Sequence, residues 1–337
     1  MGWLEAVCTA VVRYFFQFFW TSLTAVHLLK DRLLYRNVVT KAYPKPKCLE
    51  GWCSHFIQLE GVTLHYVQSG QNEKPLLLMI HGFPEFWYSW RYQLKEFQRD
   101  YRCVAIDMRG YNLSEKPIGV ENYCLDILAN DIQLVIRKLG YQRAIVMAHD
   151  WGAIVAWQTA MMFPEVIEKL VICNVPHPKA YEISFKQLLK SWYIFMFQSP
   201  YIPEWSVANR DFRMLNAMFR GRKGGLKNRQ NFTEEDLQAW RYVFSQEGAL
   251  TPPINFYRAL FSAPSKFRTS ELIQPPVLIV WGTGDPFLTK ESAKKSVQFC
   301  RSAQLYLLEG ISHWVQQDEP QKVNARIRKF LDENSKL

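Results

Sequence analysis

The stretch Ala144–Ala153 reads AIVMAHDWGA and decides the fold. Its first four residues are apolar, which predicts a buried parallel strand, and a helical pattern follows from Ala153. Ala148 and Gly152 stand two residues on either side of Asp150. Small residues at those places permit a sharp turn between strand and helix, because larger side chains would collide with the neighbouring chain. Asp150 is then either a nucleophile that attacks carbon and forms an ester, or only the cap of the helix.

Strands and helices alternate on both sides of this turn. Predicted strands cover residues 55–59, 62–68, 75–80, 103–106, 144–147, 170–175, 277–281 and 304–308, and predicted helices cover residues 123–139, 153–162, 290–299 and 320–331. The alternation stops between residues 176 and 268, where Trp, Tyr and Phe become frequent. We therefore expect a doubly wound, mostly parallel α/β sheet with an inserted helical cap. The expected core comprises residues 54–175 and 269–337, and the expected cap comprises residues 176–268.

The composition of the whole chain is typical of a folded protein with a large core. The chain has 337 residues, of which 48% are hydrophobic and 21% are charged, which excludes a disordered protein. The net charge is +10, but the basic residues are spread along the chain and the densest group, at 220–229, is rich in glycine. This distribution disfavours a nucleic-acid partner. Seven cysteines without metal-ligand spacing indicate a reducing compartment.

The N-terminal residues 6–29 form an apolar run long enough to cross a bilayer. Arg13 lies near one end of the run, where its side chain can reach the membrane interface. No cleavage site follows, so we expect a membrane anchor over residues 1–30 and a linker over 31–53, with a helix lying on the membrane as the alternative. Six basic residues between Lys30 and Lys47 predict that the catalytic body is cytosolic. The expected location is a single-pass membrane position, in the endoplasmic reticulum.

A second functional turn follows the strand predicted at residues 75–80. His81–Pro84 reads HGFP. Gly82 permits a tight turn, and Pro84 can hold the preceding peptide bond in an unusual, cis geometry. This turn would direct the backbone N–H of Phe83 toward the nucleophile. Together with the N–H of Trp151, it would form a two-donor oxyanion hole.

An acid and a histidine follow two later strands. Asp285 comes after residues 277–281, and His313 comes after residues 304–308. Each residue alone is more often structural, but the chain order nucleophile, acid, histidine at three strand ends predicts a catalytic triad. His313 would be the general base for water, and Asp285 would fix its tautomer. Asn174 is an alternative orienting residue.

Five motifs resemble the epoxide hydrolases of the α/β-hydrolase superfamily. They are His81–Pro84, Asp107–Tyr111, His149–Ala153, Gly282–Asp285 and Ser312–Trp314. The match runs from about residue 55 to the C-terminus, and with the apolar N-terminal run it is most similar to the membrane-anchored animal epoxide hydrolases of types 3 and 4. Ala148 and Asn112 replace glycines of the family pattern, and both are small or tolerate left-handed backbone.

The resemblance implies hydrolysis of a lipophilic, fatty-acid-type epoxide to a vicinal diol through an aspartyl ester, without a cofactor or a metal. It assigns Tyr193 and Tyr257 of the cap as donors to the epoxide oxygen, because a phenol can donate to an oxygen that gains negative charge. The residues implied to line the substrate site are His81, Pro84, Trp151 and Trp314.

Two other functions fit parts of the pattern. A haloalkane dehalogenase shares the Asp–Trp turn but requires an N–H-bearing side chain where this chain has Phe83. Fluoroacetate dehalogenases share HGFP, but this chain has Trp151 and Ile154 where they carry arginines that bind the substrate carboxylate. The second alternative is a non-catalytic, membrane-tethered binding protein on the same scaffold.

Overall fold

A single eight-stranded sheet forms the centre of the molecule. The computed structural model describes residues 3–34, 43–181, 185–262 and 272–333. The strands are β1 (Cys53–Leu59), β2 (Val62–Ser69), β3 (Leu76–Ile80), β4 (Arg102–Ile106), β5 (Ala144–His149), β6 (Ile167–Cys173), β7 (Val277–Gly282) and β8 (Ala303–Leu308). Their order is β1-β2-β4-β3-β5-β6-β7-β8. Only the pairings β1–β2 and β2–β4 are antiparallel, so the expected mostly parallel sheet is confirmed.

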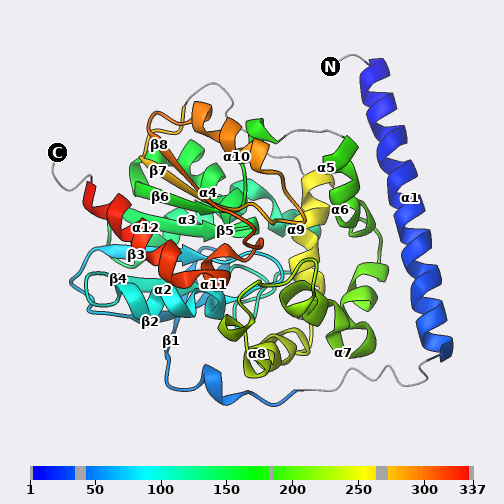
Figure 1. Ribbon diagram of the computed structural model, residues 1–337, viewed down its shortest axis with the longest axis horizontal. Coiled ribbons are helices and arrows are strands. Elements are labelled where there is room, and N and C mark those ends of the chain that lie inside the picture. The colour runs from blue at the N-terminus through cyan, green and yellow to red at the C-terminus, as the bar shows by residue number, and fades with distance from the viewer. Residues whose placement is uncertain (1–2, 35–42, 182–184, 263–271, 334–337) are drawn as a thin grey trace.

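Helices cover both faces of this sheet. The α-helices around the sheet are α2 (Arg91–Phe97), α3 (Leu125–Lys138), α4 (Trp151–Met162), α10 (Lys290–Ser296), α11 (Val315–Asp318) and α12 (Pro320–Glu333). Helices α3 and α4 pack together on one face, and α2, α11 and α12 pack together on the other (Figure 1). The residues of β3 and β5 are all buried, because helices cover these strands on both sides.

Between β6 and β7, the residues that the structure describes form five α-helices. They are α5 (Phe185–Lys190), α6 (Trp192–Met196), α7 (Ile202–Arg220), α8 (Glu234–Phe244) and α9 (Thr251–Ser262). They lie together beside the sheet, in the green and yellow part of Figure 1. This insertion is the helical cap expected from the loss of strand–helix alternation, and we keep the name cap for helices α5–α9.

The strand after the nucleophile turn differs from its predicted bounds. The apolar pattern predicts a strand over residues 170–175, whereas β6 runs from Ile167 to Cys173. The strand ends there because Asn174 adopts a φ of 50°, a left-handed conformation that leaves the sheet. The change of direction turns the Asn174 side chain toward the strand-end loops of β7.

The N-terminal helix α1 (Trp3–Leu34) stands at the edge of the molecule beside α6 and α7 (Figure 1). It begins within the expected anchor and continues four residues beyond residue 30. Over the described residues, no helix combines the length and the apolarity needed for a membrane crossing, so the expected single-pass span is not confirmed. Polar residues such as Arg13, Gln17 and His27 interrupt the apolar run of this helix. The linker expected at residues 31–53 falls partly outside the described residues.

Candidate active site

Asp150 lies in a sharp turn between β5 and α4. Its backbone adopts φ 48° and ψ −122°, a conformation that residues other than glycine rarely adopt. The neighbouring glycines are required sterically, since a Cβ on Gly152 would lie 2.4 Å from the carbonyl oxygens of Ile80 and His81. The Asp150 side chain makes no capping hydrogen bond to α4. Of the two interpretations of the sequence, the geometry therefore favours a presented carboxylate over a helix cap.

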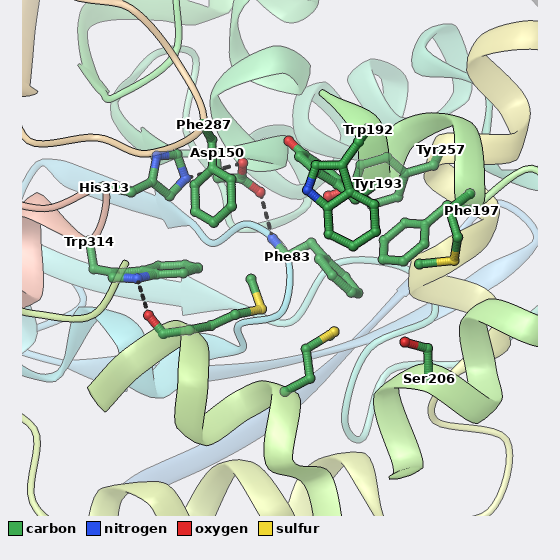
Figure 2. Close-up of a pocket in the computed structure, with 13 residues that line it drawn as sticks. Phe83, Asp150, Trp192, Tyr193, Phe197, Ser206, Tyr257, Phe287, His313 and Trp314 are labelled. Carbon is green, nitrogen blue, oxygen red and sulfur yellow. Dashed lines mark hydrogen bonds and ion pairs between the residues drawn. The ribbon is translucent and has the colours of Figure 1, made fainter. Parts of the chain in front are cut away.

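A chain of contacts through three strand-end residues leads to this carboxylate. His313 Nε2 lies 3.3 Å from Asp150 Oδ2 (Figure 2). His313 Nδ1 lies 2.6 Å from Asp285 Oδ2. Asn174 Nδ2 also donates to Asp285 Oδ2, at 2.7 Å. The other oxygen of Asp285 accepts the backbone N–H groups of Phe287 and Leu288. Asp285 is thus held on every side and orients the histidine, while Asn174 supports Asp285.

Burial and charge together set the protonation of these groups. Burial opposes the charged form of His313, but the charges of Asp285 and Asp150 outweigh it and raise the pKa of His313 to about 10. Burial likewise opposes the ionised carboxylates, yet His313 holds the pKa of Asp150 and the pKa of Asp285 below their usual values. The unreacted site therefore contains an imidazolium between two carboxylates.

The HGFP turn supplies a backbone donor to Asp150. The N–H of Phe83 donates to Asp150 Oδ1 at 2.7 Å (Figure 2). The Phe83–Pro84 peptide bond is cis, as the sequence indicates it can be. Trp151 is the first residue of α4, where backbone N–H groups have no acceptor within the helix. The two backbone groups expected to form an oxyanion hole therefore flank Asp150.

Two cap tyrosines lie on different helices and share a pocket with Asp150. Tyr193 belongs to α6 and Tyr257 to α9, and their ring centroids lie 5.9 Å apart. Both line the same pocket as Asp150 (Figure 2). Burial, and after it the charge of Asp150, raises the pKa of each phenol well above its usual value. Both hydroxyls therefore stay protonated and can donate.

The pocket between cap and sheet is a cavity of about 190 Å³. Besides the residues already described, its lining is mainly aromatic and thioether side chains: Trp192, Met196, Phe197, Met214, Met218, Phe287 and Trp314, with Ser206 as a polar exception. Most of these residues come from α6 and α7, and sequence patterns give no signal for them. Such a lining favours an apolar substrate.

The other expected substrate contacts divide into two groups. Trp314 lines the pocket and donates from Nε1 to the carbonyl of Met218. Trp151, His81 and Pro84 are not among the pocket-lining residues. Both ring nitrogens of His81 are engaged by backbone groups, namely the carbonyl of Gly82 and the N–H of Met108. His81 thus stabilises the HGFP turn and connects it to Met108.

A buried hydrogen-bond network, which the sequence does not predict, connects three loops of the candidate site. They are the HGFP turn, the turn at Asp150 and the loop that carries His313. Glu85 Oε2 accepts from the N–H of Gly82 at 2.9 Å and lies 2.7 Å from His149 Nδ1. His149 Nε2 lies 2.9 Å from the carbonyl oxygen of His313. Gln317 donates to the other oxygen of Glu85 at 2.9 Å. Hydrogen bonds of Glu85 and His149 therefore connect these three loops.

Comparison with known proteins agrees with this geometry. The family model described as alpha/beta hydrolase fold matches residues 75–320. The chain is 51% identical to Epoxide hydrolase 2 of Caenorhabditis elegans over 301 residues, covering 88% of this chain and 85% of that protein. It is 43% identical to human Epoxide hydrolase 4 over 291 residues, covering 84% of this chain and 80% of that protein.

A solved structure matches as well. The crystal structure of the Bacillus megaterium epoxide hydrolase with an inhibitor superposes with a TM-score of 0.75 at 32% identity, covering 82% of this chain and 100% of that chain. The relatives are epoxide hydrolases, and the matches cover most of both chains. The family assignment is therefore epoxide hydrolase, and not dehalogenase or non-catalytic binding protein. The chain belongs to the epoxide hydrolases of the α/β-hydrolase fold, and it is a hydrolase.

Proposed function

We propose that the protein hydrolyses lipophilic epoxides to vicinal diols through an ester on Asp150. The observation that carries this proposal is the convergence of one carboxylate, one histidine and two phenols on a single apolar pocket. A carboxylate can attack an epoxide carbon, but the opened oxygen needs a proton donor to be a good leaving group. Tyr193 and Tyr257 are those donors.

In the first step, an Asp150 oxygen forms a bond to an epoxide carbon while the carbon–oxygen bond of the ring breaks. The electron pair of that bond moves to the ring oxygen, which takes a hydrogen bond and then a proton from a cap tyrosine. The elevated pKa of both phenols keeps this proton available at neutral pH. The product is a hydroxyalkyl ester of Asp150.

In the second step, His313 takes a proton from water, whose oxygen attacks the ester carbonyl carbon. The N–H groups of Phe83 and Trp151 stabilise the oxyanion that forms. When this intermediate collapses, the bond between the acyl carbon of Asp150 and the diol oxygen breaks, and that oxygen takes the proton from His313. The Asp150 carboxyl group then returns its proton to His313, which restores the carboxylate and the imidazolium. Loss of the Asp150 charge in the first step removes one of the two carboxylates that raise the pKa of His313. Ester formation therefore lowers this pKa, so the imidazolium gives up a proton, which restores the donor tyrosine from its phenolate. Neutral His313 can then act as a base.

Covalent trapping tests this mechanism. Asp150→Ala should abolish diol formation, while His313→Gln should still open the ring but fail to hydrolyse the ester. Mass spectrometry of His313→Gln mixed with a lipid epoxide should show an adduct on the peptide that contains Asp150. Asp332→Ala, which changes an exposed carboxylate on α12, is the matched control and should retain activity. An unmodified Asp150 peptide in a variant that still binds substrate would refute the ester.

The donor role of the tyrosines has a separate test. Tyr193→Phe and Tyr257→Phe should each slow ring opening by about tenfold to a thousandfold, the range for loss of one transition-state donor. The double variant should be nearly inactive because no acid remains. A double variant within about threefold of wild type would place the donor elsewhere.

We also propose that α1 attaches the protein to a membrane along one exposed face. Val11, Phe15, Val26 and Leu33 are between 62% and 81% exposed and follow helical spacing. Arg32 in the last turn of the helix can contact anionic headgroups. Attachment on the cytosolic side of the endoplasmic reticulum fits the basic residues that follow.

Vesicle flotation and protease digestion test this attachment. Phe15→Glu and Val26→Glu should release the protein from anionic lipid vesicles, while Leu113→Glu, at an exposed apolar residue outside α1, should not. Intact microsomes treated with protease should lose the catalytic body. Protection of the body until detergent is added would contradict the cytosolic side.

A further inference from the structure

We propose that helix α1 is a positioning element for ring opening, because it holds the two cap helices that carry Tyr193 and Tyr257. This inference rests on the donor role proposed for the tyrosines. The observation behind it is a continuous set of contacts from α1 to α6, α7 and α9. These contacts use the face of α1 opposite the exposed one described above.

The contact with α6 is aromatic. The Trp20 and Trp192 ring centroids lie 5.6 Å apart, and the Phe16 and Phe195 centroids also lie 5.6 Å apart. Trp192 itself lines the pocket and directly precedes Tyr193. Helix α6 has five residues, too few to be stable without external packing. A large part of that packing comes from α1.

The contact with α9 links the second tyrosine to the same helix. The Arg13 guanidinium lies 4.4 Å from the ring centroid of Phe261, near the end of α9. The ring centroids of Phe261 and Phe195 lie 6.3 Å apart, and the Phe195 ring also packs on Phe16. Rings from α1, α6 and α9 thus form one cluster behind the two tyrosines. A shift of α1 would be transmitted to both tyrosine-bearing helices.

The contact with α7 fixes the other end of α1. Asp31 is 4% exposed and accepts from Asn209 Nδ2 at 2.8 Å, with Arg210 Nη1 at 3.5 Å. Asn209 and Arg210 lie where the helical conformation of α7 is interrupted. The hydroxyl of Thr21 also contacts that of Ser199, between α6 and α7. Helix α1 is thereby attached along its length and cannot slide without breaking a buried charge contact.

The two half-reactions should respond differently to loss of these contacts. Ring opening needs the phenols in place, and displacement by about 1 Å can cost a hundredfold in rate. Ester hydrolysis depends on Asp285 and His313, which follow β7 and β8 and are held by the buried network and by Asn174. Loosening α1 should therefore slow the first step and spare the second.

The test compares substitutions on the two faces of α1 in full-length, detergent-solubilised protein with a water-soluble epoxide. Rapid quenching and mass spectrometry give the rate of adduct formation in the His313→Gln background. Phe16→Ala/Trp20→Ala should reduce this rate tenfold or more. Phe18→Ala, which removes a side chain that is 74% exposed, should leave it within twofold of the parent. Trp20→Phe alone keeps an aromatic ring at this position, and its rate of adduct formation should stay close to that of the parent.

The second readout separates positioning from general destabilisation. With His313 present, the adduct decay rate of Phe16→Ala/Trp20→Ala should stay within twofold of wild type. Equal slowing of both steps, equal effects of the two faces, or an unchanged rate of adduct formation would each overturn the inference. Tyr193→Phe and Tyr257→Phe are measured in parallel. If they leave adduct formation unchanged, the donor role fails; if they slow it while Phe16→Ala/Trp20→Ala does not, only the role of α1 fails.

Discussion

His313 is paired with two carboxylates in the unreacted site, and only one of them takes part in the proposed bond formation. Asp285 keeps its charge throughout because Asn174 and two backbone N–H groups hold it. Asp150 loses its charge when it is alkylated. In the proposed mechanism, the same histidine is therefore protonated before ring opening and acts as a base after it.

This pairing predicts different pH profiles for the two half-reactions. Asp150 has a lowered pKa and both tyrosines have raised pKa values, so the rate of ring opening should be constant from about pH 5 to pH 9. Ester hydrolysis needs neutral His313, so its rate should rise with pH and then level off. The levelling should occur well below pH 10, the approximate pKa of His313 before the ester forms, because the ester removes the charge of Asp150. Rapid-quench measurements at each pH resolve the two rates. A ring-opening rate that rises steeply over this range would contradict the charge assignment.

The catalytic residues differ in how far the sequence alone predicts them. Asp150, Asp285 and His313 follow apolar strands, and strand ends at one edge of a parallel sheet are brought together by the fold itself. Tyr193 and Tyr257 were indicated only by resemblance, because each lies on a helix whose approach to the pocket depends on cap packing. Lining residues of α6 and α7 had no sequence signal for the same reason.

At the level of elements, the junction of β5 and α4 is set by close backbone contact. The strand β3 passes so near the first turn of α4 that residue 152 has no room for a methyl group. The short strands and helices around it follow the apolar periods of the sequence within a few residues. The division into core segments 54–175 and 269–337 and a cap over 176–268 remains our prediction.

Substitution of the glycine at this junction should be costly. Gly152→Ala would force the HGFP turn away from Asp150, and we expect a loss of about 1–3 kcal/mol in the free energy of unfolding together with impaired ring opening. Gly224→Ala is the control, since a Cβ there would meet only Pro286 at 3.6 Å. Chemical denaturation of both variants measures the difference. Equal stability of the two would show that the junction can relax.

At the scale of the whole molecule, one buried carboxylate joins the cap to the histidine loop. Asp318 is fully buried and accepts backbone N–H groups from Lys227 and Asn228 of the cap and from Ser312 beside His313. No sequence pattern points to this residue, because its partners in the insertion lie about 90 residues away in the chain. Long-range backbone contacts of this kind depend on the finished fold.

Removal of that carboxylate should destabilise the protein as a unit. Asp318→Ala leaves three backbone N–H groups without this acceptor, of which the one on Ser312 is buried. We expect the free energy of unfolding to fall by about 3 kcal/mol. Asp332→Ala, at an exposed carboxylate on the next helix, should change it by less than about 0.5 kcal/mol. Urea titration followed by circular dichroism distinguishes the two. A loss for Asp318→Ala no larger than for Asp332→Ala would mean that cap and core are held by other contacts.

The tryptophan that follows the catalytic base has an optical consequence. The Trp314 ring is fully buried, and its centroid lies 5.0 Å from that of His313. A protonated imidazole quenches indole fluorescence more strongly than a neutral one. If the proposed ester forms, we expect emission from Trp314 to rise at that step and to fall when the diol leaves. Trp314 would then report on both proposed steps without a labelled substrate.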